Sequence, residues 1–314
     1  MQPVIPFEPA RGESVPAGEK WIHQIKWDGV RLLAYNDGKG TELYNRKRRE
    51  RTGHYPELAD GSFCRAASFI TDGEVIALGP DGKPSFHEVM RRDGIRNMER
   101  VNEMRKAVPV MYMIFDLLYA DGAWLTELPL ADRQRIMEDL IVPGEHVRLA
   151  ASYPDGEALF DAVRRQNMEG IVCKDLSGAY AIGGKDGRWV KVKHYGDVTA
   201  VIGGFTQRGG VVGSLLAGLY DGAGKLRFIG KAGMGKLSAA ERRALTEVLK
   251  SVLTGVCPFA GRHPEMKDAH FVLPLLTAKI RYSEWRRREG RTLRQAVIQG
   301  FVDASPEECL LEDD

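Results

Sequence analysis

The chain has 314 residues, 43% of them hydrophobic and 28% charged, and its formal net charge is +2 at pH 7. This length is long for one domain and suits two, the composition is that of an ordinary globular protein, and so small a net charge does not by itself indicate a nucleic-acid-binding protein. No run approaches the roughly 20 apolar residues of a membrane helix, the first residues show no basic, apolar leader, and the four cysteines lack zinc-site or disulfide spacing, so we expect a cytoplasmic protein that binds no membrane.

The segment from Trp21 to Tyr195 is rich in predicted strands. Around Lys26, the alternating sequence WIHQIKWDGVRLLAY predicts a strand, a tight turn and a second strand. Helices are predicted over 131–140 and 157–166. Apolar alternation and β-branched or aromatic residues predict further strands in ELYNR, SFITDGEVIAL, VPVMYMIFDLLY, EGIVCKD and RWVKVKH.

The character of the sequence changes after a predicted hinge at 194–197. Short, glycine-containing strands follow, and then a helix over 238–253 that opens with a capping box formed by Ser238 and Glu241. Short strands with one helix in about 120 residues predict a small β-barrel of the OB kind. We therefore predict an α+β protein with a sheet-rich domain over 1–195 and an OB-fold domain over 196–314.

Charged and aromatic residues recur along the first domain. Lys26 lies on the predicted turn, Glu74 interrupts an apolar strand, and Phe115 lies in another apolar run. Lys191 and Lys193 are two residues apart in one strand, so both face the same side and repel each other unless an anion lies between them. Each residue alone also has a structural explanation, as a solvated charge, a turn cap or a core aromatic.

Taken together and in order, these segments resemble a known family. KWDGVR, TDGEVIAL, IFDLLY, EGIVCK and WVKVK resemble the ordered motifs of the covalent nucleotidyltransferases, specifically the ATP-dependent DNA ligases. GSLLAGLYDGAGKLRFIGKAG, KIRYSEW and EGRTLRQAVIQGF resemble the bacterial end-joining ligases, namely the ligase module of ligase D and the related ligase C. The resemblance extends from about residue 2 to residue 300, and it implies a nucleotidyltransferase (adenylation) domain of antiparallel sheets flanked by helices.

The resemblance implies a catalytic set in the first domain. Lys26 would attack the α-phosphate of ATP and carry AMP as a covalent lysine adduct. An ordinary lysine is protonated at neutral pH, so its surroundings must favour the neutral amine. Asp28 and Glu169 would organise the lysine and Mg²⁺, with Mn²⁺ as an alternative metal. Lys191 and Lys193 would stabilise charge on the α-phosphate.

The resemblance also implies a set of nucleotide-binding residues. Glu74 would bind the ribose hydroxyls, Phe115 would stack on adenine, and Arg31 would contact the ribose or the 5′-phosphate of the nick. Gln24 stands where the family often has Glu, and its amide oxygen can still accept a hydrogen bond from the adenine amino group. Lys174, which ends the EGIVCK motif, belongs to the same set.

Two further departures from the family concern DNA contact and the first reaction step. Arg46 is implied to contact the nucleotide and DNA, but Lys47 and Arg48 follow it where the family usually has Asn-Gly. We expect the usual turn to be lost there and DNA-binding charge to be gained. The C-terminal Arg-x-Asp-Lys motif of the family has no clear match. Arginines that could substitute for it are Arg281, Arg287 and Arg294.

The expected substrate is nicked double-stranded DNA, and the resemblance implies a Ku-like end-binding partner, a monomeric enzyme and a role in DNA repair by end joining. Three alternatives stay open on the sequence. They are an RNA ligase, a capping-type guanylyltransferase, and a non-catalytic nucleic-acid-binding scaffold that has lost self-adenylation.

Overall fold

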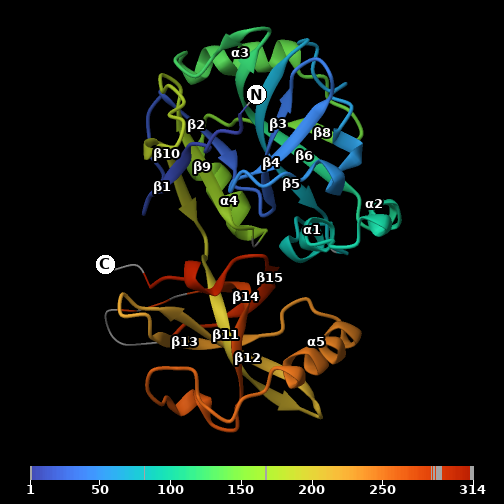
Figure 1. The fold of residues 1–314 in the computed structure, drawn as a ribbon. Coiled ribbons are helices and arrows are strands. Elements are labelled where there is room, and N and C mark those ends of the chain that lie inside the picture. Colours follow the sequence, from blue (N-terminus) through green and yellow to red (C-terminus); the bar gives the residue numbers. More distant parts are fainter. Residues whose placement is uncertain are drawn as a thin grey trace. The chain divides into compact units, whose positions relative to one another are not determined.

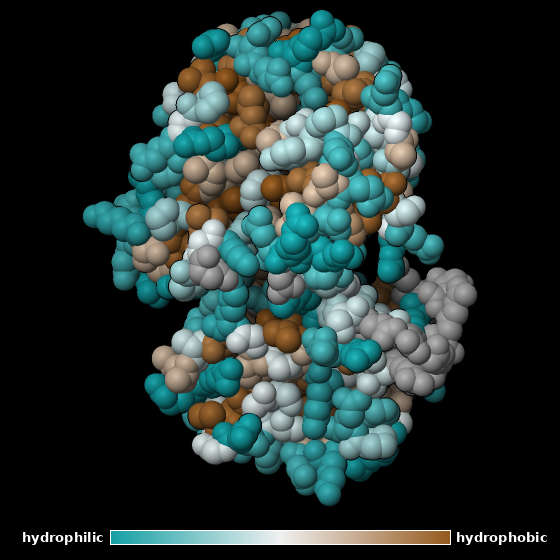
Figure 2. All heavy atoms as spheres, turned by 180° about the vertical axis from the view of Figure 1, so that it is seen from behind, coloured by the Kyte–Doolittle hydropathy of each residue, from teal (hydrophilic) through white to brown (hydrophobic). Residues whose placement is uncertain are grey.

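The computed structural model describes residues 2–80, 82–166, 168–283, 285, 287 and 292–311. The chain folds into two compact units, Met1–His194 and Tyr195–Asp314 (Figure 1). Figure 2 shows one face of the molecule, on which hydrophilic side chains dominate both units and hydrophobic side chains form small patches. Within the described ranges, no helix is long and apolar enough to cross a membrane.

The first unit contains a four-stranded sheet that carries three of the sequence motifs. Its order is β1-β10-β9-β2, with β1 parallel to β10 and the other pairs antiparallel. One face packs against helix α4 (Gly156–Arg165) through Leu159 and Val163. Asp155 caps this predicted helix by accepting from the Ala158 N–H. The strands are β1 (Glu8–Arg11), β2 (Trp21–Ile25), β9 (Gly170–Asp175) and β10 (Lys185–Lys193).

The second sheet of this unit has six strands, in the order β4-β3-β5-β6-β7 with β8 paired to β6. Its inner face meets the first sheet in a shared core, where Leu33 and Ile70 of the second sheet pack with Trp189 of the first. The other face of the four-stranded sheet therefore lies against the six-stranded one. The strands are β3 (Val30–Asn36), β4 (Thr41–Asn45), β5 (Phe69–Ala77), β6 (Val110–Ala120), β7 (Ala123–Trp124) and β8 (Val147–Leu149).

Three more helices belong to the first unit. The predicted helix α3 (Leu130–Leu140) is confirmed, and its buried Arg133 forms a two-bond ion pair with Asp116 of β6. Helices α1 (Phe86–Asp93) and α2 (Val101–Ala107) were not predicted. Each has about two turns, and only α1 has a side-chain cap, in which Ser85 accepts from the Glu88 N–H.

The chain segment around Lys26 differs from the predicted tight turn. Strand β2 belongs to the four-stranded sheet and β3 to the six-stranded sheet, so residues 26–29 cross from one sheet to the other. Gly29 lies at the crossing, where a Cβ atom would lie 2.2 Å from the carbonyl oxygen of Val75. Gly29 thus allows the start of β3 to lie close against β5 within the six-stranded sheet, and the crossing segment places Lys26 at the border of both sheets.

The second unit is the predicted OB barrel. Its five strands close in the order β11-β12-β13-β15-β14. Helix α5 (Ala239–Ser251) carries the predicted capping box, because Ser238 accepts from the Glu241 N–H while the Glu241 side chain accepts from the Ser238 N–H. The strands are β11 (Gly196–Arg208), β12 (Val211–Tyr220), β13 (Leu226–Gly233), β14 (His270–Tyr282) and β15 (Val297–Val302).

Candidate active site

Strands β2, β9 and β10 set the motif residues in parallel rows on the sheet face that lies toward the six-stranded sheet. Directly opposite residues of antiparallel neighbours project from the same face, and successive rows are about 7 Å apart. The alternate residues of these strands make up the opposite face, which packs on α4. The rows are Ile22, Lys174 and Trp189, then Gln24, Val172 and Lys191, and then Lys26, Gly170 and Lys193.

The two lysines of the third row share a carboxylate from Glu169, the residue that precedes Gly170. The buried carboxylate of Glu169 lies 2.9 Å from the Nζ of Lys26 and 2.9 Å from the Nζ of Lys193. Gly170 allows this approach, because its φ is +155° and a Cβ atom there would lie 2.2 Å from the carbonyl oxygen of Val192. Glu169 therefore supplies a counter-charge to Lys193, one of the two β10 lysines that were expected to require an anion.

Lys191 of the second row lies close to Lys26. Burial lowers the pKa of the Lys191 amine, and the neighbouring cations Lys26 and Lys185 lower it further, against the opposing effect of Glu8 and Glu169. Clustered cations at the end of a strand form a site that favours a polyanion.

Gln24 and Val172 lie beside Lys191 in the second row. The Gln24 amide nitrogen donates to the Oγ of Ser152 at 3.0 Å, which leaves the amide oxygen as an acceptor. Val172 is partly buried, and so is Phe115, which reaches the same core from β6 of the other sheet. This pairing of an aromatic ring with an aliphatic side chain suits a flat nucleobase.

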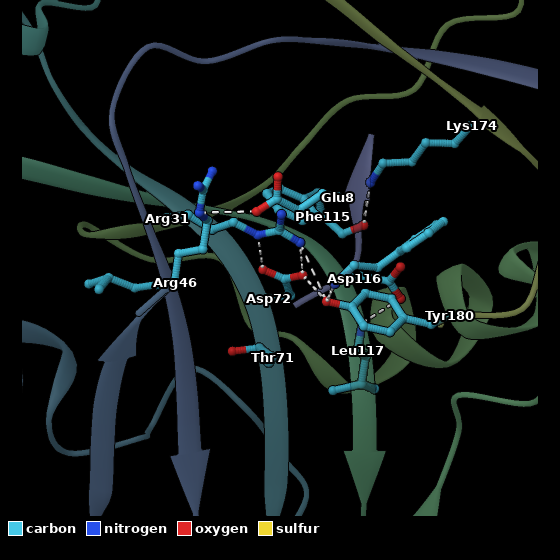
Figure 3. A network of polar contacts seen from close by, with 12 residues as sticks. Glu8, Arg31, Arg46, Thr71, Asp72, Phe115, Asp116, Leu117, Lys174 and Tyr180 are labelled. Atoms are coloured by element: carbon cyan, nitrogen blue, oxygen red, sulfur yellow. Dashed lines mark hydrogen bonds and ion pairs between the residues drawn. The ribbon is translucent and has the colours of Figure 1, made fainter. Parts of the chain in front are cut away.

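Arg31 is held by a buried carboxylate that sequence reasoning did not identify. Its Nε and Nη2 atoms donate to the two oxygens of Asp72 at 2.9 and 2.6 Å, and the hydroxyl of Tyr180 donates to the same carboxylate at 2.6 Å (Figure 3). A buried arginine requires such a partner, so the Asp of TDGE was a usable signal. Tyr180 lies in a loop, and no spacing in the sequence could have indicated it.

The other two predicted carboxylates, Glu74 and Asp28, lie on β5 and on the crossing segment. Glu74 is half-buried on β5, directly opposite Arg31 on β3. Asp28 is half-buried on the crossing segment. Among the described residues, no group of three or more metal-binding side chains occurs. Mg²⁺ typically takes one or two protein carboxylates together with substrate phosphates. Glu169 and Asp28 are therefore suited to hold Mg²⁺ jointly with a bound phosphate, and not to form a metal site from protein ligands alone.

The predicted DNA-binding residues lie on the exposed turn after β4, and the expected loss of this turn is wrong. The side chain of Asn45 accepts from the N–H groups of Lys47 and Arg49, both at 3.0 Å. Arg48 takes the left-handed conformation that glycine would favour, with a φ of +59°. Arg46 is 61% exposed and pairs with Glu8 at 3.0 Å (Figure 3).

The candidate C-terminal arginines lie in the second unit. The guanidinium of Arg281 stacks on the Tyr195 ring at 4.7 Å, and that of Arg287 stacks on the Trp285 ring at 5.8 Å. The Arg294 carbonyl accepts from Ser283. Several residues of this arginine-rich segment, including 288–291, lie outside the described residues.

The two-sheet unit and the OB barrel together have the architecture of the nucleotidyltransferases. Models of the ATP-dependent DNA ligase domain and of the ATP-dependent DNA ligase C-terminal region match residues 13–193 and 208–303. A solved structure of mycobacterial DNA ligase D, complexed with ATP and MES, is 34% identical with a TM-score of 0.73, and the match covers 98% of both chains.

Two named relatives are similar along the chain. The multifunctional non-homologous end joining DNA repair protein LigD of Mycobacterium tuberculosis is 34% identical over 302 residues, which cover 93% of this chain and 38% of that protein. The DNA ligase of Thermococcus onnurineus is 28% identical over 311 residues, which cover 93% of this chain and 53% of that protein. The chain thus spans about half or less of these relatives, and it belongs to the ATP-dependent DNA ligases.

Proposed function

We propose that the first unit is the adenylation domain of a ligase that seals nicked double-stranded DNA through an AMP adduct on Lys26, with the OB domain as the second DNA-binding element. The observation that carries the proposal is the stack of rows on the four-stranded sheet. It runs from the first row, where Ile22 and Trp189 flank Lys174, through the amide of Gln24, to the Lys26–Glu169–Lys193 arrangement. A nucleoside triphosphate would lie along these rows with its base toward the first row and its phosphates toward the lysines of the third.

In the first step, the neutral amine of Lys26 attacks the α-phosphorus of ATP. The N–P bond forms, the bond from the α-phosphorus to the leaving oxygen breaks, and pyrophosphate departs. The ammonium proton must leave Lys26 first, and the Glu169 carboxylate lies within reach to receive it, at 2.9 Å. Lys191 and Lys193 stabilise the negative charge that develops on the phosphate oxygens.

The base and ribose contacts follow from the first and second rows and from the facing sheet. Phe115 and Val172 provide two surfaces for adenine, and Gln24 accepts from its amino group. Glu74 binds the ribose hydroxyls. Arg31 keeps Nη1 for the nucleotide, since its Nε and Nη2 are engaged by Asp72.

The later steps transfer AMP to DNA. An oxygen of the 5′-phosphate attacks the adenylate phosphorus, the P–N bond to Lys26 breaks, and the amine takes up a proton. The oxygen of the 3′-hydroxyl then bonds to the 5′-phosphorus and loses its proton to solvent, while the bond from that phosphorus to the bridging oxygen breaks, which releases AMP and closes the strand. Mg²⁺, held by Glu169 and Asp28, would neutralise phosphate charge. Arg46, Lys47 and Arg48 would contact the DNA phosphates.

The cellular setting is part of the same proposal. Relatives described as non-homologous end joining proteins support a role in end joining. A Ku-like end-binding partner is part of our proposal. All four cysteines are free thiols, and three of them, Cys64, Cys173 and Cys309, are buried, which supports a reducing, cytoplasmic compartment. We propose a monomer.

Sealing assays on matched nicked duplexes test this function. The wild-type protein with ATP and Mg²⁺ should seal a DNA nick, and Lys191→Ala should lose sealing while Lys39→Ala, on an exposed loop, should not. A preference for nicked RNA would favour an RNA ligase, and labelling by GTP would favour a capping enzyme. Failure to seal even a pre-adenylated DNA nick would leave only the scaffold hypothesis.

A further inference from the structure

Lys174 is the one charged member of the first row, and its amine lies in an aromatic enclosure. The residue is 2% exposed. Its Nζ lies 4.3 Å from the ring centroid of Phe115 and 4.0 Å from that of Trp189. The same atom donates to the carbonyl oxygen of Phe115 at 3.2 Å (Figure 3). The amine therefore contacts both the ring and the backbone of the residue that we assign to adenine stacking.

The carboxylates around this amine are already matched by guanidinium groups. Arg31 of β3 donates two hydrogen bonds to Asp72 of β5, and Arg133 of α3 donates two to Asp116 of β6. These two pairs are neutral overall, so a proton on Lys174 adds one uncompensated buried charge. Burial is the largest cause that lowers the pKa of Lys174, to about 7. The carboxylates of Asp116 and Asp72 act in the opposite direction and raise this pKa, whereas the cations Arg31 and Arg133 lower it further.

A role in packing alone does not account for this lysine. An apolar side chain would fill the same space without a buried amine, and replacing buried ionic groups by apolar ones is often stabilising. The neighbouring row on the strand holds Gln24, Val172 and Lys191, so Lys174 lies next to the proposed nucleotide position rather than in a remote part of the core.

We propose that Lys174 is a positioning residue for the nucleobase, whose amine fixes the Phe115 ring in the orientation that adenine stacking requires. This inference rests on the proposed adenylation site. Cation–π attraction holds the ring, and the hydrogen bond to the Phe115 carbonyl holds the strand beneath it. Without the amine, the ring can turn, and the base must order it on binding.

Binding of the triphosphate should also be coupled to the charge of this amine. An anion near the site favours the protonated form. Below pH 7 the amine already carries its proton, and ATP then binds most tightly. As the pH rises through 7 to 9, binding must draw a proton onto Lys174, so the affinity of the wild-type protein should fall.

Calorimetric titration with α,β-methylene ATP tests the inference, because this analogue cannot transfer AMP to Lys26. Wild type, Lys174→Met and Lys174→Arg are compared at pH 6.5 and 8.5, each in two buffers of different ionisation enthalpy. Lys174→Met should weaken binding about three- to tenfold at pH 6.5. It should also abolish the excess proton uptake that wild type shows at pH 8.5. Lys174→Arg should bind at both pH values without that uptake.

Equal affinity and equal proton uptake in wild type and Lys174→Met would overturn the inference. A loss of affinity that is the same at both pH values, with unchanged proton uptake, would also overturn it and indicate a structural role. If Lys174→Met does not fold, the comparison of wild type with Lys174→Arg is sufficient. Equal proton uptake on binding in these two proteins at pH 8.5 would show that Lys174 does not take up the proton, and would overturn the inference. Nick sealing by the wild-type protein is a separate measurement, so failure of the ligase function can be told apart from failure of this inference.

Discussion

Replacing Lys174 by Met should make the first unit more stable at neutral pH, and the gain should shrink as the pH rises. The pKa of this lysine falls from 10.5 to about 7 on folding, mainly through burial. Such a shift corresponds to about 5 kcal/mol of disfavoured charge burial at pH 7 and below. Between pH 7 and 10.5, the unfolded chain binds a proton that the folded protein does not. The unfolding free energy of the wild type therefore rises by up to about 1.4 kcal/mol per pH unit in this window.

The assay is urea unfolding at pH 7.5 and pH 9, followed by tryptophan fluorescence, since Trp189 lies on the lysine. The advantage of Lys174→Met over wild type should fall by about 2 kcal/mol between the two pH values. Taking the difference between variants cancels the titration of the other groups. Lys39→Met, at an exposed loop, is the matched control for replacing a lysine. An advantage that is constant with pH would refute the assignment of Lys174 as a lysine destabilised by its own charge.

The turn, the motif glycine and the buried carboxylate give three more predictions. Arg48→Gly should raise the unfolding free energy by about 1 kcal/mol in urea titration, because glycine adopts a positive φ without strain; a loss of stability would contradict the left-handed turn. Gly170→Ala should lower it by about 3 kcal/mol or more, since the new Cβ would meet the Val192 carbonyl at 2.2 Å, and a wild-type denaturation midpoint would disprove that packing. Glu169→Gln should keep the melting temperature within a few degrees but slow AMP transfer at least about 100-fold; near-normal transfer would exclude a role for the carboxylate.

Most of the architecture could be predicted from local patterns. Alternation and capping residues identified most strands of both units and the helices α3, α4 and α5, but not the short strands β1, β7 and β8 or the last barrel strand β15. Helix α1 has a side-chain cap, because Ser85 accepts from the Glu88 N–H, so the Ser-x-x-Glu pattern at 85–88 was a usable signal. Helix α2 has only seven residues and no side-chain cap. The crossing at residues 26–29 was predicted as a turn, because alternation marks a strand but does not say which strand it pairs with.

The candidate site could be predicted only in part, because local patterns show which residues of one strand share a face but not which strands lie side by side. Spacing within β10 correctly placed Lys191 and Lys193 on one face, since a strand has a fixed period of two. The rows that join them to Gln24 and Lys26 depend on the register between strands, which no local pattern specifies. The partnership of Arg31 with Asp72, and the aromatic enclosure of Lys174, arise only when the two sheets pack together.

The most direct test of the account is to find where AMP becomes attached. The protein is incubated with ATP and Mg²⁺, denatured, digested, and analysed by mass spectrometry for an AMP-modified peptide. We expect AMP on Lys26, released by pyrophosphate or by nicked DNA, absent in Lys26→Ala and retained in Lys39→Ala. AMP on a different residue, or no adduct in a protein that still binds ATP, would contradict it.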